Sequence, residues 1–268
     1  MKREITGLIL IIVVVASIQI PSPIPFLALV LLVSLLAYRE FDRLARAKGM
    51  DAAWPGGVFF SWALVLSFYL PWLKIEWVIP AALFVIPLLY LTPKKGKEQV
   101  LARVAIAVYT ILYTGLLLGY MAGLKMMDDG GHMARNLLYF LFLVVCGSDT
   151  GAYYVGKTFG RHPLAPVLSP KKTIEGSVAG LGSAVLLALA AKYTFLTAMP
   201  IAHAVLLALF LGVISQLTDL IESMFKRSAS VKDSSSFLPG HGGILDRIDS
   251  LAFAGPVMYY YYYFFHSP

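Results

Sequence analysis

The stretch Ile201–Ile221, IAHAVLLALFLGVISQLTDLI, decides the fold class. Apart from Asp219, it holds no side chain that is fully ionised at neutral pH. A helix needs roughly 20 apolar residues to cross the hydrocarbon core of a bilayer, and this stretch is about that long. It therefore predicts a membrane-spanning helix that carries one carboxylate near its end.

Similar apolar runs occur eight more times along the chain. They are Ile5–Ile20, Pro25–Tyr38, Gly56–Trp72, Trp77–Leu91, Leu101–Leu124, Leu137–Val155, Ser177–Phe195 and Leu251–Phe265. The prolines of PSPIP, between the first two runs, favour a tight turn. We therefore expect an all-α, polytopic integral membrane protein with about nine transmembrane helices.

The composition of the whole chain agrees with a membrane protein. Of the 268 residues, 59% are hydrophobic and only 14% are charged, which is too few charges to cover a soluble surface of this size. No cleavable signal peptide is expected, because the first apolar run is long and lacks a small-x-small cleavage site. The single cysteine, Cys146, excludes an internal disulfide, and its apolar neighbours predict a small packing residue.

The lysines and arginines predict the orientation, because positive charge gathers on the cytoplasmic side of a membrane. If nine spans are assumed, all but Lys74, Lys125, Arg135 and Lys192 of the 22 basic residues lie on the side of the N-terminus. The N-terminus is therefore expected to be cytoplasmic. The net charge of +7 is attributed to this basic face and not to nucleic-acid binding.

Acidic side chains at membrane depth indicate the functional region, because they are costly unless they face a protein interior or a cavity. Six of the 15 acidic residues lie at or near one membrane face in the second half of the chain. They are Asp149, Glu175, Asp219, Glu222, Asp246 and Asp249. By contrast, the charges of both signs between Leu36 and Asp51 are expected in a solvated loop.

Three groups of residues suit a phosphate bound to a cation. If the helix at Asp219 continues, Ser223 and Lys226 fall on the same face as that carboxylate. Asp246 and Asp249 follow PGHGG, whose glycines allow backbone N–H groups to approach an anion. Lys171 and Lys172 are adjacent cations just before a helix that Thr173 is expected to cap. Helix-end snorkelling of Lys226 and simple capping by one aspartate are the structural alternatives.

The segment Ser223–Ser250 resembles the signature of the phosphatidate cytidylyltransferases, also called CDP-diacylglycerol synthases, of bacterial type. The matched positions are Ser223, Lys226, Arg227, Lys232, Asp233, Pro239, His241, Gly242, Gly243, Asp246, Arg247 and Asp249. The upstream block Ser148–Gly180 is also similar to that family. The resemblance covers about a hundred residues of the C-terminal half, whereas the N-terminal half agrees only in having several spans.

The resemblance implies transfer of CMP from CTP to phosphatidate, with pyrophosphate released. Asp219 and Asp246 would bind one or two divalent cations, with Mg²⁺ as the expected metal. Whether a second ion is monovalent is left open. The phosphates would be contacted by Ser223, Lys226, Arg227, Lys232 and Arg247. These residues would be supported by Asp233, His241 and Asp249. The substrate site would also be lined by Lys171, Lys172, Gly242 and Gly243. Residues 1–100 would form an N-terminal region of about four spans, and residues 101–268 a catalytic region of about five, with the signature at 219–250.

The resemblance further implies a multi-pass protein of the bacterial inner membrane whose active site faces the cytoplasm. Its partners would be the two substrates and membrane lipids, with no nucleic acid, and a homodimer stays open. The roles of Asp149, Glu175 and Glu222 are not assigned. The rival functions are a CTP-dependent polyprenol kinase and a cation-coupled transporter, whose buried carboxylates would bind the permeating ion. A CDP-alcohol phosphotransferase is disfavoured, because its D-G-x-x-A-R motif is missing.

Overall fold

The structure is a computed structural model that describes residues 2–91, 99–127, 132–231, 233–235, 237 and 242–266. The chain divides into two compact units, which we describe separately. The first unit comprises Met1–Met126 and Ser228–Arg247, and the second comprises Met127–Arg227 and Ile248–Pro268. The expected division into an N-terminal region of residues 1–100 and a catalytic region concerns function, and it stays a prediction.

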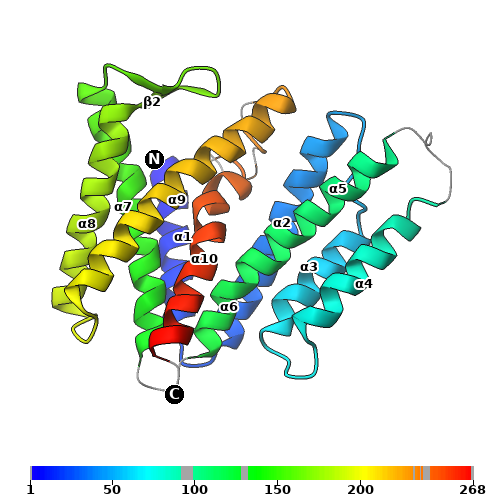
Figure 1. The fold of residues 1–268 in the computed structure, drawn as a ribbon, viewed down its shortest axis with the longest axis horizontal. Coiled ribbons are helices and arrows are strands. Elements are labelled where there is room, and N and C mark those ends of the chain that lie inside the picture. The colour runs from blue at the N-terminus through cyan, green and yellow to red at the C-terminus, as the bar shows by residue number, and fades with distance from the viewer. Residues whose placement is uncertain are drawn as a thin grey trace. The chain divides into compact units, whose positions relative to one another are not determined.

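The N-terminal part of the first unit is a group of helices (Figure 1). Its elements are α1 (Lys2–Gln19), α2 (Ile24–Arg46), α3 (Gly56–Ser67), α4 (Ile75–Leu88), α5 (Val100–Ile111), a π-helical segment (Leu112–Leu117) and α6 (Leu118–Met126). Buried apolar side chains from α2 to α5, among them Tyr38, Leu64, Ile86 and Ile111, form one cluster. The π-helical segment lies where Gly115 approaches the backbone of Ser61, and a Cβ there would be 2.7 Å from the Ser61 Cα.

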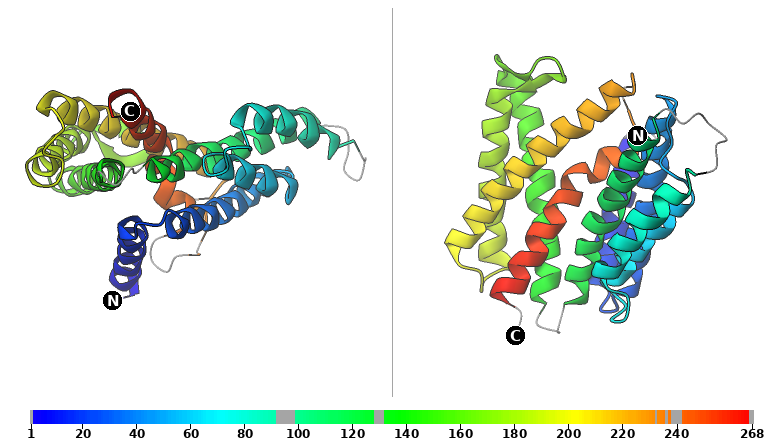
Figure 2. Two further views of the ribbon diagram at one scale, coloured as in Figure 1. Left: turned by 90° about the horizontal axis from the view of Figure 1, so that it is seen from below. Right: turned by 45° about the vertical axis from the view of Figure 1, so that its right-hand side comes forward.

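The second unit is built on two long helices that lie side by side (Figures 1 and 2). Its elements are α7 (Met133–Phe159), β1 (Pro163–Ala165), β2 (Ser169–Thr173), α8 (Ile174–Thr194), α9 (Ile201–Ser228) and α10 (Leu245–Phe265), whose first residues belong to the first unit. The strands β1 and β2 pair as an antiparallel hairpin at one end of α7 and α8. The expectation of an all-α fold is therefore wrong at this hairpin, where Pro163, Pro166 and Pro170 prevent a regular helix.

Each of the nine predicted apolar runs corresponds to helix in the described residues, but not every helix has the length of a crossing. Helices α2, α7, α8, α9 and the continuous Val100–Met126 are long and apolar enough to cross a membrane. The apolar parts of α1, α3 and α4 are shorter, and α3 ends at Ser67 instead of Trp72. Helix α10 carries charges in its first turns and many tyrosines in its last. A multi-pass membrane protein is confirmed, while the count of nine crossings stays a prediction.

Two further expectations about burial are wrong. The segment after Leu36 is not a solvated loop, because α2 continues to Arg46 and buries the side chains of Glu40 and Asp42. Cys146 is exposed on α7 and does not pack inside the unit. In a membrane protein, apolar side chains occupy both the interior and the lipid-facing surface. Apolar neighbours in the sequence therefore do not predict that a residue is buried.

Small residues on α8 allow α7 to approach closely. Gly176, Gly180, Ala184, Ala188 and Ala191 are the buried residues of α8, and they recur every three or four positions. A Cβ on Gly180 would lie 2.9 Å from the Ser148 carbonyl oxygen, and one on Gly151 would meet the Ser183 hydroxyl. The predicted close packing of these glycines is confirmed. It fixes α7 against the helix that follows the hairpin.

Gly180→Ala is expected to lower the free energy of unfolding by about 1–3 kcal/mol, because the added methyl group must push α7 and α8 apart. Gly182→Ala is the matched control, since a Cβ there meets nothing within 4 Å. Thermal unfolding of both variants in detergent should show a lower Tm for Gly180→Ala alone. Equal Tm values for the two variants would contradict the close approach.

Candidate active site

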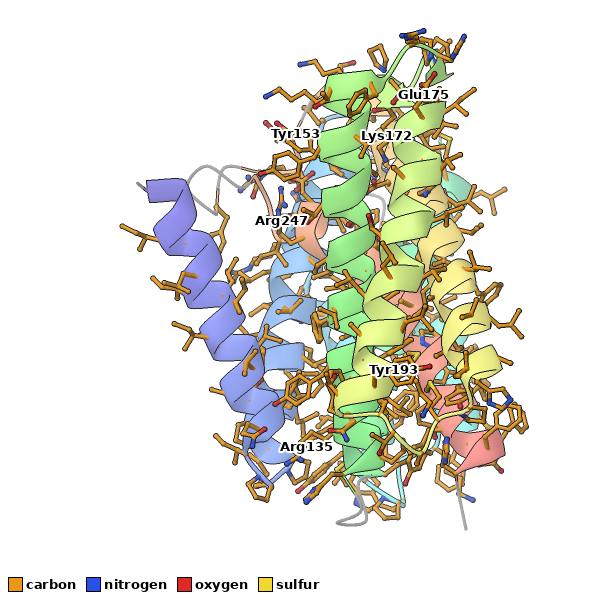
Figure 3. All side chains as sticks on the ribbon, turned by 90° about the vertical axis from the view of Figure 1, so that its left-hand side faces the viewer. Arg135, Tyr153, Lys172, Glu175, Tyr193 and Arg247 are labelled. Carbon is orange, nitrogen blue, oxygen red and sulfur yellow. The ribbon has the colours of Figure 1, made fainter. Side chains whose placement is uncertain are left out.

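A cavity of about 660 Å³ lies in the second unit, among α7, the hairpin, α8 and α9. Its lining residues are Asp149, Ala152, Tyr153, Gly156, Lys157, Leu164, Lys171, Lys172, Thr173, Gly176, Ser177, Gln216 and Asp219. Three lysines and two aspartates therefore surround a space large enough for a substrate group with several charges. In Figure 3, Tyr153, Lys172 and Glu175 lie toward one end of α7 and α8, and Arg135 and Tyr193 lie toward the other.

An ion pair joins the hairpin to α9 inside this cavity. The Lys172 Nζ atom lies 2.5 Å from the Asp219 Oδ2 atom, and about a third of each side chain is exposed. Secondary structure fixes the backbone at Lys172. The residue lies in β2, and Thr173, which follows it, caps α8 by accepting a hydrogen bond from the Gly176 N–H. The predicted cap is confirmed. The ion pair places a cation and a carboxylate together at the cavity wall.

Asp219 also meets a second carboxyl group. The Asp249 side chain lies close enough to Asp219 and Glu222 for their charges to interact. Asp249 is only 5% exposed, so water screens these charges poorly. Two carboxylates this close repel each other when both are ionised, and a nearby cation stabilises the pair.

The predicted stripe of α9 is present, although its lysine has another partner. Helix α9 continues to Ser228, so Asp219, Ser223 and Lys226 lie on one face. Lys226 donates to Glu222 Oε2 at 2.9 Å, one helical turn away. Glu222 is buried, and the ion pair accounts for its position at membrane depth.

Hydrogen bonds at the next turns of α9 hold the cavity walls together. Gln216 accepts a hydrogen bond from the Ser177 hydroxyl and donates to the Ser177 carbonyl oxygen at 2.9 Å. The Ser215 hydroxyl donates to Asp149 Oδ1 at 2.7 Å, and Ser250 lies 3.0 Å from the same hydroxyl. Sequence reasoning flagged Asp149 as a costly membrane carboxylate but gave it no role, and it missed Gln216 and Lys157. A polar residue inside an apolar run was the available signal for Gln216.

Glu175 lies at the base of the hairpin and not on a substrate-facing surface. Its Oε1 atom is 2.6 Å from the His162 Nδ1 atom, and its Oε2 atom accepts from the backbone N–H groups of Arg161 and His162. The carboxylate therefore closes the hairpin onto the first turn of α8. These contacts give Glu175 partners just before β1, at the start of the hairpin.

In the first unit, the chain before α10 wraps around Asp246. Its Oδ2 atom accepts hydrogen bonds from the Gly243 N–H at 2.7 Å and the Ser234 N–H at 3.2 Å, and the Ser234 hydroxyl oxygen lies 2.9 Å away. Gly242 has a φ of 77°, which a side chain would strain. Pro239 and Gly240 of the PGHGG stretch lie outside the described residues. Hydrogen bonds of this kind orient a carboxylate that serves as a ligand.

The remaining predicted residues have different surroundings. Lys171 is exposed at the cavity and Ser223 is partly buried, whereas Arg227, Asp233 and Arg247 are exposed. Lys232 and His241 lie outside the described residues. Asp219 and Asp246 belong to different units, so their joint role as metal ligands stays a prediction.

The donors at Asp219 fit a hard divalent cation. Among the described residues, no group of three or more His, Cys, Asp and Glu side chains is arranged to hold a metal ion. Magnesium, however, takes one or two protein carboxylates and fills its remaining positions with water and phosphate oxygens. The contact between Asp219 and Asp249, beside a cavity, offers carboxylate oxygens of this kind.

This chain is similar to several known proteins that carry the same name. The model of the Cytidylyltransferase family matches residues 1–265. The chain belongs to this family. It is 31% identical to the phosphatidate cytidylyltransferase of Bacillus subtilis over 99% of this chain and 98% of that protein. The identity is 35% to the Synechocystis enzyme of the same name, over 87% of each chain, and 34% to that of Staphylococcus haemolyticus, over 85% of each.

Family membership extends the similarity beyond the signature. The match begins at residue 1, so it includes the N-terminal helices, which the signature alone had left unexplained. Both compact units are therefore parts of one family fold. The relationship to bacterial relatives also agrees with the multi-pass architecture and its apolar helices.

Proposed function

We propose that this chain is a phosphatidate cytidylyltransferase, which transfers CMP from CTP to phosphatidate and releases pyrophosphate. The observation that carries this proposal is the cavity of the second unit, where Lys172 and Asp219 form an ion pair beside two further lysines. A nucleoside triphosphate and a lipid phosphate are both anions, and a site that joins them must supply positive charge. The family and its named relatives support the same reaction.

In the proposed reaction, an oxygen of the lipid phosphate attacks the α-phosphorus of CTP. A phosphorus–oxygen bond forms there, and the bond to the β-phosphate oxygen breaks, so pyrophosphate leaves. A general base is not required, because the lipid phosphate is already ionised at neutral pH. The chain's part is to neutralise charge and to align the two phosphates, which is the main source of catalysis in phosphoryl transfer.

We assign these tasks to residues that line the cavity and to residues of the signature. Lys157, Lys171 and Lys172 contact phosphate oxygens, and Arg227 and Arg247 remain proposed phosphate contacts from the signature. Asp219 and Asp246 are the proposed metal ligands, and the Asp249 carboxyl group lies beside that of Asp219. Bound Mg²⁺ would supply further positive charge to the phosphates of both substrates. Release of Lys172 from Asp219 on metal binding would free that lysine for a phosphate.

We also propose that the cavity faces the cytoplasm of a bacterial cell at the inner membrane. The hairpin end of the second unit carries Lys171 and Lys172, and Arg135 lies toward the other end (Figure 3). This charge asymmetry supports a cytoplasmic hairpin. A homodimer stays a prediction.

Product analysis tests the proposed reaction. Purified protein is incubated with phosphatidate, Mg²⁺ and CTP that carries tritium in cytosine and ³²P in the γ-phosphate. The expected result is tritium in the lipid extract and ³²P in pyrophosphate, in equal amounts. Label from ³²P in the lipid, together with free CDP, would instead identify a lipid kinase. Cation flux in vesicles without any nucleotide-dependent product would identify a transporter.

A further inference from the structure

Glu40 is a buried acidic residue of α2 for which the proposed reaction has no direct use. Its side chain is 5% exposed, and α2 lies in the N-terminal part of the first unit. A carboxylate at such a position is costly unless hydrogen bonds or cations compensate for its charge. Its partners are therefore informative.

Four donors surround the Glu40 carboxylate. Three come from described residues of the signature loop, which we define as residues 229–244, and the fourth comes from the start of α10. Oε1 accepts from the Ser235 hydroxyl at 2.5 Å and from the Ile244 N–H at 3.0 Å. Oε2 accepts from the Ser234 hydroxyl at 2.9 Å and from the N–H of Leu245, the first residue of α10, at 2.8 Å. Each oxygen thus receives one hydroxyl and one backbone N–H group.

This arrangement requires a carboxylate and not merely a polar side chain. Two carboxylate oxygens accept up to four hydrogen bonds, whereas an amide has one accepting oxygen and one donating NH₂ group. The backbone N–H groups of Ile244 and Leu245 cannot reverse their direction. A glutamine at position 40 would therefore leave one of them facing another donor. The negative charge also favours the N-terminus of α10, where unpaired N–H groups gather.

The same contacts lead directly to a proposed metal ligand. The Ser234 hydroxyl lies 2.9 Å from Glu40 Oε2 and 2.9 Å from Asp246 Oδ2. Gly243 packs directly against Ser234 and Glu40, because a Cβ at this position would meet both the Ser234 hydroxyl and the Glu40 carboxylate. The position of Glu40 is thereby coupled, through one serine, to the orientation of Asp246.

We propose that Glu40 is a positioning residue, which holds the signature loop and the first turn of α10 in the conformation that turnover requires. The proposal rests on the proposed function, because it concerns the same reaction. It gives the N-terminal helices a part in catalysis beyond membrane anchoring. Glu40 itself touches no substrate in this account, and it acts through Ser234, Ser235 and the start of α10.

The kinetic test compares Glu40→Gln with Asp42→Asn. Asp42 is the matched control, because it is a buried carboxylate of the same helix that binds Arg46 and the Ala52 N–H instead of the signature loop. We expect kcat of Glu40→Gln to fall about 100-fold, as displacements near 1 Å do, with KM for CTP within about threefold of wild type. For Asp42→Asn, both constants should stay within about threefold. An equal loss of kcat in both variants, or none in Glu40→Gln, would overturn the proposal.

A second readout does not depend on activity. A spin label is attached at Phe237→Cys, an exposed position of the signature loop, in a Cys146→Ser background. Glu40→Gln should increase the mobility of this label, and Asp42→Asn should leave it unchanged. Equal mobility in all three proteins would overturn the proposal even if the wild-type enzyme catalysed another reaction.

A milder variant covers the case in which Glu40→Gln does not fold. Ser235→Ala removes one of the four donors and should lower kcat about tenfold, with increased label mobility. A Ser235→Ala protein with wild-type kcat and mobility would contradict the role of this hydrogen bond and, with it, the proposal. Wild-type protein without transferase activity but with the expected mobility change would refute the proposed function alone.

Discussion

Asp219→Asn is expected to lower the rate of CDP-diacylglycerol formation by about 1,000-fold, with little effect on membrane insertion or purification yield. Asparagine keeps the size of the side chain but removes its charge, so it loses the ion pair with Lys172 and binds a divalent cation far more weakly. Losing one preorganised electrostatic contact at a reacting phosphate costs about 100- to 1,000-fold, and loss of a cation falls at the upper end. The measurement is kcat with saturating CTP, phosphatidate and Mg²⁺.

The control for Asp219→Asn is Glu76→Gln, an equal change of charge at an exposed position of α4. This variant should keep wild-type kcat. If Asp219→Asn retained a tenth or more of wild-type turnover, Asp219 would have no role in binding a cation or the phosphates. Raising the Mg²⁺ concentration should not rescue the variant, because asparagine offers a single neutral oxygen.

Lys172→Met is expected to lower kcat/KM for CTP by about 100-fold. The lysine is held at the cavity wall by its pairing with Asp219, so it is in place to meet a phosphate when a cation occupies the carboxylate. A charge-assisted contact to phosphate at a partly buried site contributes roughly 1.5–3 kcal/mol, which corresponds to 10- to 100-fold. Methionine retains most of the apolar stem and tests the ammonium group alone.

Lys192→Met provides the matched control for Lys172→Met. Lys192 lies in the last turn of the same helix that Thr173 caps, and it donates to the Thr197 carbonyl oxygen. Its replacement should change kcat/KM for CTP by less than about twofold. Equal losses in the two variants would indicate a general effect of net charge instead of a specific phosphate contact.

The helices were predictable because the bilayer imposes a simple rule on the sequence. Long apolar runs must become helices when no water satisfies their backbone, and all nine predicted runs contain helix. The β-hairpin was not predicted, since its residues lie outside the long apolar runs to which that rule applies. Its prolines at 163, 166 and 170 indicate only that a regular helix is absent.

The candidate site was predictable where chemistry and spacing reinforce each other. Asp219, Ser223 and Lys226 fall on one helical face whenever α9 continues, as it does. Glu40 could not be found in this way, because its partners lie from 194 to 205 residues away and include two backbone N–H groups. A sequence gives no sign of which backbone donors a distant carboxylate will meet.

The pairing of Lys172 with Asp219 was equally hidden. Asp219 was singled out as a carboxylate at membrane depth, and Lys172 as one of two lysines before a helix. Their contact depends on the hairpin that turns β2 toward α9. Asp249 likewise shows no pattern that assigns it to Asp219, because the two lie on different helices. The sequence therefore indicated which residues belong to the candidate site, but it did not indicate which of them pair with one another.

The transfer of the lipid's own phosphate oxygen to the α-phosphorus is the step on which the whole account depends. It is measured directly by giving the enzyme CTP, Mg²⁺ and phosphatidate whose non-bridging phosphate oxygens are ¹⁸O, followed by mass spectrometry of both products. The account predicts that all of the ¹⁸O stays in CDP-diacylglycerol and that pyrophosphate carries none. Appearance of ¹⁸O in pyrophosphate, or its loss from the lipid product, would contradict it.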